Sequence, residues 1–107
     1  MDVQITPRRL SGVVTPPPSK SLAHRYVIAA SLAAGTSSVK NVAFSEDIEA
    51  TLRCMEALGA SWEAAEDGLR VAGIGGERRP FGDLPQFDCG ESGSTLRFLI
   101  PIALTVD

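Results

Sequence analysis

Residues 16–25 have the sequence Pro-Pro-Pro-Ser-Lys-Ser-Leu-Ala-His-Arg, in which a stiff proline segment leads directly into a helix start. Pro18 has no N–H to donate and disfavours helix in the residue before it, while Ser19 is a preferred N-cap residue. We therefore expect a helix from Lys20 to Ala34, which Gly35 ends. Its inward-facing residues are expected to be Leu22, Ala23, Tyr26, Val27, Ala30 and Ala33.

The first two turns of this helix gather positive charge and a hydroxyl group. Lys20 and His24 are four residues apart, as are Ser21 and Arg25, so we expect all four on the polar side of the helix. A hydrogen bond to a charged group contributes about 1.5–3 kcal/mol, whereas a helix N-terminus contributes only about 0.3–1 kcal/mol to an exposed anion. The pattern therefore predicts an anion site held mainly by side chains. The alternative is a solvated charge pair on an ordinary amphipathic helix.

The rest of the chain alternates between expected strands and helices. Strands are expected at 3–6, 11–14 and 36–42, and Ser45 is a good N-cap for a second helix. That helix has an apolar stripe, which indicates core packing. The Asp67-Gly68 pair between two further strands is typical of a hairpin, and residues 75–82 form a polar loop. The order is βαβαββ, an α/β fold with helices covering one face of a mixed sheet. The stripe consists of Ile48, Leu52, Met55 and Leu58.

A second informative stretch runs from Cys89 to Arg97 and combines Gly and Ser residues with a helix start. Gly93 has no Cβ, so its backbone N–H can approach a ligand closely. The stretch lacks the spacing of a Walker loop or a dinucleotide fingerprint, so nucleotide binding is not indicated. Residues 97–100 match residues 25–28 in type, 72 positions later, which predicts that a second copy of the unit begins here with a helix over 93–106. Pro101 is expected to kink that helix.

Composition narrows the class of protein. The chain has 107 residues, 44% of them apolar, and a net charge of −3, which suits a globular domain and argues against nucleic-acid binding. The sequence has no long apolar run and no signal-peptide features near Met1, so we expect a cytoplasmic protein that does not bind membranes. Cys54 and Cys89 form no disulfide or metal motif, and there is one His. We expect two reduced thiols, no metal and no cofactor.

Residues 19–21, Ser-Lys-Ser, followed by Arg25 on an Ala-rich helix, resemble the N-terminal signature of the EPSP synthase family. These transferases move an enolpyruvyl (carboxyvinyl) group from phosphoenolpyruvate to the 5-hydroxyl of shikimate 3-phosphate, in the shikimate pathway of aromatic amino-acid biosynthesis. The sister family, the UDP-N-acetylglucosamine enolpyruvyl transferases, typically has Asn after the equivalent Lys and lacks the Arg. Ser21 and Arg25 therefore favour the first family.

The resemblance implies roles for individual residues. Lys20 would be the catalytic residue that bridges both substrates, and Ser21 and Arg25 would hold shikimate 3-phosphate. Around the second stretch the family carries Gly-Asn-Ala-Gly-Thr and, three residues later, Arg, so Gly93 would contact phosphoenolpyruvate and Arg97 would support that wall, with Ser94 in place of Thr. Glu91 departs from the usual Asn, and we assign it no binding role because its carboxylate would repel anionic substrates unless it points away or pairs with a cation.

Family members have two domains, each of three βαβαββ units. On that template, residues 1–18 are N-terminal strands and a crossover linker, 19–85 are the first unit, and 86–107 begin the second. The family's acidic catalytic residues would follow Asp107, so we expect these 107 residues alone to be inactive and able to self-associate, and the whole enzyme to be a monomer. The alternatives are a UDP-N-acetylglucosamine enolpyruvyl transferase and a non-catalytic phosphate-binding or protein-interaction module.

Overall fold

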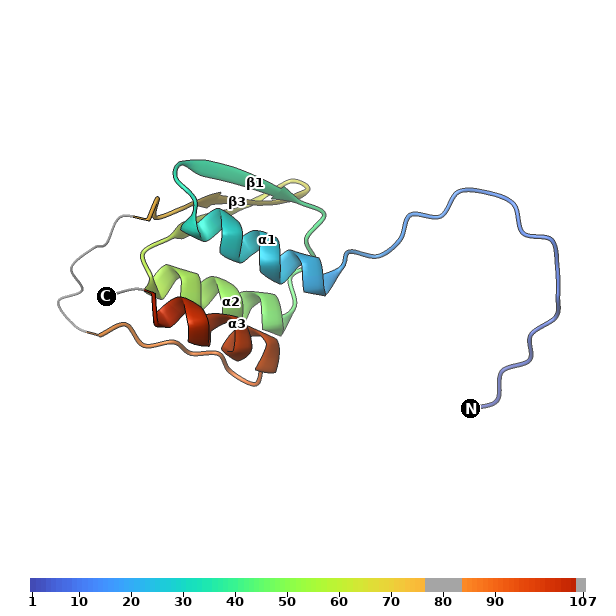
Figure 1. The fold of residues 1–107 in the computed structure, drawn as a ribbon. Coiled ribbons are helices and arrows are strands. Elements are labelled where there is room, and N and C mark those ends of the chain that lie inside the picture. The colour runs from blue at the N-terminus through green and yellow to red at the C-terminus, as the bar shows by residue number, and fades with distance from the viewer. Residues whose placement is uncertain (77–83, 106–107) are drawn as a thin grey trace.

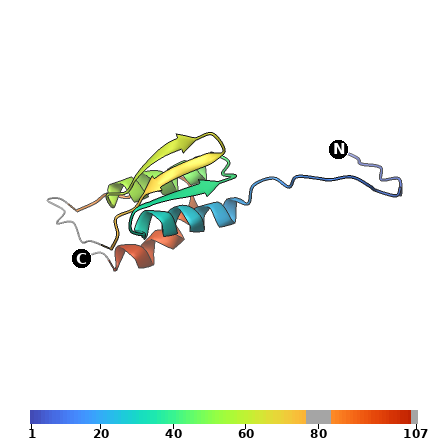
Figure 2. The same cartoon turned by 90° about the horizontal axis from the view of Figure 1, so that it is seen from above.

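Three helices and one three-stranded sheet make up the folded part of the chain (Figure 1). The computed structural model describes residues 1–76 and 84–105. In chain order the elements are α1 (Lys20–Leu32), β1 (Thr36–Lys40), α2 (Glu46–Ala57), β2 (Ser61–Ala65), β3 (Gly68–Ala72) and α3 (Gly93–Ala103). Helices α1 and α2 lie over one face of the sheet, and α3 packs beside α2 (Figures 1 and 2).

The sheet is antiparallel, not mixed as expected. Its order is β1-β3-β2, and both outer strands run antiparallel to β3, with Thr36 and Ser61 each opposite Ala72. A parallel pair would have needed a strand ahead of α1, joined to the sheet by a helical crossover. Residues 3–6 and 11–14 do not form strands. The described unit is therefore αβαββ, and the predicted leading strand is wrong for this structure.

Residues 1–19 instead extend away from the folded part (Figure 1). Val3, Ile5 and Val13 are all at least 76% exposed, so alternation alone did not produce a strand. A strand requires hydrogen bonds to a neighbouring strand and a surface on which to bury its apolar face. In this structure the N-terminal segment has neither.

Helix α1 begins where the proline-serine pattern predicted. The Ser19 side chain accepts a hydrogen bond from the Leu22 N–H at 3.3 Å. The buried face is rotated from the predicted one, since Leu22 and Tyr26 are exposed while His24 and Ser31 are buried. The helix turns this face toward α2, which supplies a polar partner for His24. Polar burial of this kind cannot be predicted from apolar periodicity.

The hairpin forms, but its loop is Glu66-Asp67, one residue earlier than the predicted Asp67-Gly68. Gly68 is the first residue of β3 and lies opposite Lys40. A Cβ at Gly68 would be 2.0 Å from the Val39 carbonyl oxygen. Glycine is therefore required here because β1 approaches closely, not because the turn needs a positive φ.

The predicted apolar stripe of α2 forms the centre of the core. Its four residues are at most 2% exposed, and they pack with residues of the sheet and of the other two helices. Helix α3 starts at Gly93 as expected, with Ser92 as its N-cap, and continues through Pro101 to Ala103. No helix in the described ranges has the length and apolar character needed to cross a membrane. Residues 77–83 of the predicted loop, and Val106 of the predicted helix, lie outside the described residues.

Candidate active site

Four of the predicted site residues, Lys20, Ser21, Arg25 and Arg97, line one pocket. The pocket has a volume of about 350 Å³ and lies between the first turns of α1 and α3. Three of its lining residues are cationic, and none of the described residues that line it is acidic. A concave site of this charge suits a negatively charged ligand. The lining residues are Lys20, Ser21, His24, Arg25, Ser94, Arg97 and Phe98.

Gly93 is not among the lining residues, but it is the first residue of α3 and directly precedes Ser94, which lines the pocket. A Cβ at Gly93 would be 3.9 Å from the Arg97 guanidinium, so the two are neighbours on the first turn. The free N–H groups of a helix start add partial positive charge to those of the side chains. Two segments 72 residues apart thus form the two walls of one pocket.

Arg25 is held in place by contacts from both helices. Its guanidinium donates to the Ser21 hydroxyl at 2.6 Å and to the Ser21 carbonyl at 2.8 Å. It also lies over the Phe98 ring, 5.0 Å from the ring centroid, in a cation–π contact. Both bonds use one terminal nitrogen, and the other two nitrogens of the guanidinium donate no hydrogen bond within the described residues, which leaves them for an anion bound in bidentate geometry. Phe98 was not predicted as a site residue, and its contact depends on α3 packing beside α1.

Lys20 is oriented by a carboxylate from the first turn of α2. Its ammonium lies 2.6 Å from Asp47 Oδ2, and the Lys20 side chain is 59% exposed. The hydrogen bond from Lys20 is the main reason that the pKa of Asp47 is below its ordinary value. Lys20 is therefore directed across the gap between α1 and α2 and stays accessible to a ligand.

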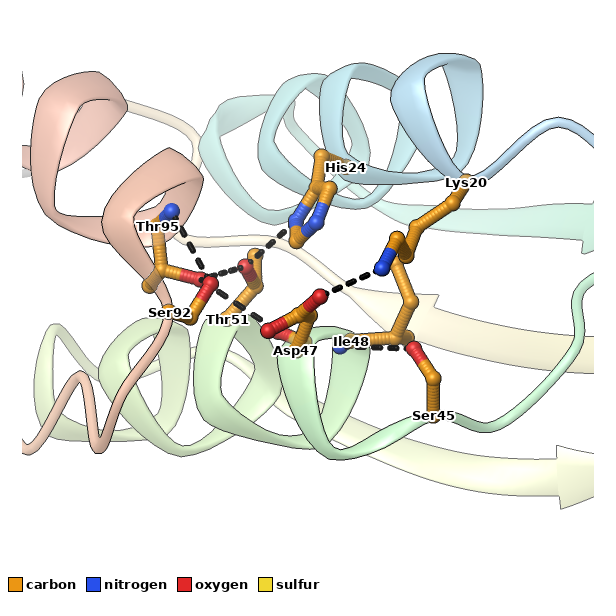
Figure 3. Close-up of polar contacts among 8 residues, drawn as sticks. All are labelled: Lys20, His24, Ser45, Asp47, Ile48, Thr51, Ser92 and Thr95. Carbon is orange, nitrogen blue, oxygen red and sulfur yellow. Dashed lines mark hydrogen bonds and ion pairs between the residues drawn. The ribbon is translucent and has the colours of Figure 1, made fainter.

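A chain of buried polar groups connects all three helices beneath the pocket (Figure 3). His24 Nδ1 is 2.8 Å from the Thr51 hydroxyl, which is 2.8 Å from the Thr95 hydroxyl, which is 2.7 Å from that of Ser92. His24 is 2% exposed, yet it lines the pocket together with Lys20, Ser21 and Arg25, so these four residues share one side of α1 as predicted, and the other helices bury His24 on that side. Burial is the largest cause that lowers the pKa of His24, with smaller lowering from Lys20 and Arg25 and an opposing effect of Asp47. The imidazole is therefore neutral near pH 7.

Glu91 does not line the pocket. It borders a neighbouring hollow together with Glu46, Glu49 and Arg53. The Glu91 carboxylate is therefore not among the groups that a ligand in the cation-lined pocket would contact. Sequence reasoning left its position open.

A larger hollow of about 500 Å³ lies between α1 and the free edge of β1. Alanine and other small residues line most of it, and Lys40 is the one charged residue among those that line it. Volume alone does not select a ligand site, and here the charges are in the smaller pocket. We therefore place the candidate active site at the smaller pocket.

The two cysteines are free thiols, as predicted, with their sulfur atoms 3.9 Å apart. Cys54 is fully buried, and burial raises its pKa to about 12. A thiol of this kind is a poor nucleophile, because the thiolate is the reactive form. We assign these residues to packing between α2 and the segment that leads into α3.

Comparison with known proteins identifies the family to which this chain is similar. The family model of EPSP synthase (3-phosphoshikimate 1-carboxyvinyltransferase) matches residues 5–107. The 3-phosphoshikimate 1-carboxyvinyltransferase of Clostridioides difficile (strain 630) is 48% identical over 112 residues, covering 98% of this chain and 26% of that protein. The enzyme of the same name from Clostridium perfringens (strain 13 / Type A) is 51% identical over 106 residues, covering 98% of this chain and 24% of that protein.

A solved structure shows the same relationship. The EPSP synthase from Acinetobacter baumannii superposes with a TM-score of 0.67 at 32% identity, covering 82% of this chain and 20% of that one. The chain spans about a quarter of the length of the curated relatives it matches. The family match over nearly all residues, together with the cation-lined pocket, leads to one conclusion: this chain belongs to the EPSP synthase family.

Proposed function

We propose that this chain supplies the N-terminal part of an active site that transfers the carboxyvinyl group of phosphoenolpyruvate to the 5-hydroxyl of shikimate 3-phosphate. The observation that supports this most directly is that Lys20, Ser21, Arg25 and Arg97 line one pocket free of lining carboxylates. Both substrates carry phosphate and carboxylate groups, so they need several cations at close range. No cofactor is needed for the addition of a hydroxyl to a polarised double bond.

Lys20 is the residue to which we assign the catalytic role. In the reaction the substrate hydroxyl adds to C2 of phosphoenolpyruvate, and the tetrahedral adduct then expels inorganic phosphate. A cation fixed between the two substrates stabilises negative charge on the phosphate that leaves. Lys20 suits this role because Asp47 directs its ammonium while more than half of its side chain stays exposed. Proton transfer falls to acidic and basic residues elsewhere in the whole enzyme.

The two walls divide the substrates between them. Ser21 and Arg25, on α1, hold shikimate 3-phosphate, and the free edge of the Arg25 fork matches a phosphate or carboxylate in bidentate geometry. On α3, the backbone N–H of Gly93 approaches phosphoenolpyruvate, and Arg97 supports that wall from one turn further on. Lys20 lies between them and bridges the substrates.

The proposal also covers the setting of the reaction. Both substrates are soluble phosphorylated metabolites, so we place the enzyme in the cytoplasm with small molecules as its partners. The whole enzyme would act as a monomer, since both walls of the pocket come from one chain. A UDP-N-acetylglucosamine enolpyruvyl transferase remains the competing activity, and substrate competition distinguishes the two.

The test uses a full-length polypeptide, meaning a protein of the relatives' length that begins with these 107 residues. Lys20→Met keeps the length of the side chain and removes its charge, and we expect it to abolish phosphate release while leaving the circular dichroism spectrum unchanged. Lys40→Met is the matched control, because Lys40 is exposed and forms its ion pair with Asp67, away from the pocket. Turnover at the wild-type rate in Lys20→Met would refute the proposal. So would a wild-type protein that uses UDP-N-acetylglucosamine, and not shikimate 3-phosphate, as the acceptor.

A further inference from the structure

The buried hydroxyl chain beneath the pocket branches at Thr95 to a backbone carbonyl, which can only accept a hydrogen bond. Besides its contacts with Ser92 and Thr51, the Thr95 hydroxyl donates to the Asp47 backbone carbonyl at 3.3 Å (Figure 3). A carbonyl oxygen can only accept, and a hydroxyl has a single proton. We assign the proton of Thr95 to the bond with Asp47, so that Thr95 accepts from Thr51 and Ser92, in two contacts whose geometry allows either oxygen to donate.

This direction passes along the chain to His24. With this assignment Thr51 donates to Thr95 over their 2.8 Å contact, and the Thr51 oxygen accepts from His24 Nδ1, also at 2.8 Å. The proton of the imidazole then lies on Nδ1. The opposite tautomer would reverse both hydroxyls and would leave a buried N–H at Nε2, which has no hydrogen-bond partner in the described residues. Free histidine side chains favour the Nε2–H tautomer, so the arrangement here is imposed by the fold.

We propose that Thr51 and Thr95 fix His24 as the neutral Nδ1–H tautomer. Through these hydrogen bonds, Thr51 and His24 act as positioning residues that hold the α1 wall and the α3 wall of the pocket in a fixed relative position. The chain joins α1 at His24 to α2 at Thr51 and to α3 at Thr95, and both threonines are completely buried. His24 lies one residue before Arg25 on α1, and Thr95 lies two residues before Arg97 on α3. The second part of this inference rests on the proposed function.

Neutrality at His24 also matters for the charge of the pocket. The charged groups that face the ring are Lys20 and Arg25 from its own helix and Asp47 from α2, with the Phe98 ring of α3 at a centroid distance of 6.2 Å. An imidazolium here would add a positive charge one turn from Lys20 and push the two cations apart. The uncharged tautomer keeps the cations where a ligand can neutralise them.

The tautomer can be measured directly, because His24 is the one histidine of the sequence. In the ¹⁵N-labelled chain near pH 7.5, two-bond ¹H–¹⁵N correlation spectra distinguish a protonated nitrogen from an unprotonated one. We expect a protonated Nδ1 and an unprotonated Nε2. A protonated Nε2 would overturn the inference whatever the activity of the enzyme.

Thr51→Val is the informative variant, since valine has the shape of threonine and lacks its hydroxyl. We expect the Nδ1–H population to fall in Thr51→Val and to be retained in Thr51→Ser. Ser31→Ala is the matched control, because Ser31 is a buried hydroxyl of α1 that donates to the Val27 carbonyl, within its own helix. An unchanged tautomer in Thr51→Val would overturn the inference, and so would the same shift in Ser31→Ala.

The positioning role is tested in the full-length polypeptide. We expect Thr51→Val to lower kcat by about tenfold, because small displacements of reacting groups have large effects on rate, and Thr51→Ser to restore most of it. Ser31→Ala should keep the wild-type kcat. An active wild type with an equally active Thr51→Val would overturn the positioning role and leave the proposed function intact. A wild type without any enolpyruvyl transfer would overturn the proposed function, while the tautomer assignment would stand on the spectra.

Discussion

Arg25→Ala separates the contribution of a binding residue to ligand affinity from its contribution to the fold. Both hydrogen bonds that the Arg25 guanidinium donates within the described residues go to Ser21, in its own helix, and its cation–π contact is with Phe98 of α3. An exposed cation–π contact contributes about 0.5–1 kcal/mol. The free energy of unfolding should therefore fall by at most about 1 kcal/mol in Arg25→Ala.

The expected effect on binding is larger. One charge-assisted hydrogen bond from the guanidinium to a phosphate is worth about 1.5–3 kcal/mol. With about 1.4 kcal/mol for each factor of ten, its loss weakens the binding of shikimate 3-phosphate by between about tenfold and about 150-fold. Arg25→Lys should recover only part of this loss, because an ammonium can neither chelate the phosphate nor stack flat on Phe98.

Isothermal titration of the full-length polypeptide with shikimate 3-phosphate gives the affinity, and urea unfolding gives the stability. Arg53→Ala is the matched control, since Arg53 is an arginine that is partly exposed and does not line the pocket. Its guanidinium pairs with Asp88 at 3.8 Å. The control variant removes the same net charge from a different place. Equal losses of affinity in the two variants would show that only the net charge of the protein affects binding. That result would refute the assignment of Arg25 as a residue that contacts shikimate 3-phosphate.

Three further outcomes follow from the same structure. Gly68→Ala should lower the free energy of unfolding by about 1–3 kcal/mol, because its Cβ would overlap the Val39 carbonyl, and an unchanged urea midpoint would contradict this close approach. The pKa of His24 is lowered from 6.5 in the folded state, so the unfolded chain binds the imidazole proton more readily than the folded chain does. The contribution of neutral His24 to the free energy of unfolding is therefore complete above about pH 6.5 and decreases as the pH falls toward the folded-state pKa. His24→Gln should remove that part of the pH dependence of the urea midpoint, and an identical profile in the variant would show that other groups cause it. The 107 residues alone should release no phosphate from phosphoenolpyruvate and shikimate 3-phosphate, and release above a protein-free blank would contradict this.

The parts of the fold that follow from local chemistry were predictable from the sequence. Ser19 and Ser45 cap helices where the pattern indicated, since an N-cap depends on a hydroxyl and the N–H three residues later. Ser92 caps α3 in the same way, at a helix start that was expected at Gly93 without a named cap residue. The common location of Lys20, Ser21 and Arg25 was predictable because they share one helix, so the geometry of that helix fixes their spacing.

The parts that depend on tertiary contacts were not predictable in this way. Residues 3–6 alternate as a strand does, yet they have no neighbouring strand in this structure and stay exposed. His24 has the same helical spacing from Lys20 as Arg25 has from Ser21, but Thr51 on another helix determines that it is buried. Phe98 reaches Arg25 only because α3 returns to the start of α1. Each case requires a contact between residues far apart in the chain, and local periodicity carries no information about it.

Helix α2 explains how the pocket acquires its shape, although no residue of α2 lines it. From its first turn, Asp47 directs Lys20 through its carboxylate and accepts from Thr95 through its carbonyl. One turn later, Thr51 lies between His24 and Thr95. A single helix thus fixes both the α1 wall and the α3 wall by polar contacts, while its apolar stripe holds it on the sheet. A substitution on the polar face of α2 should therefore alter ligand binding without touching the ligand, whereas one in the stripe should first lower stability.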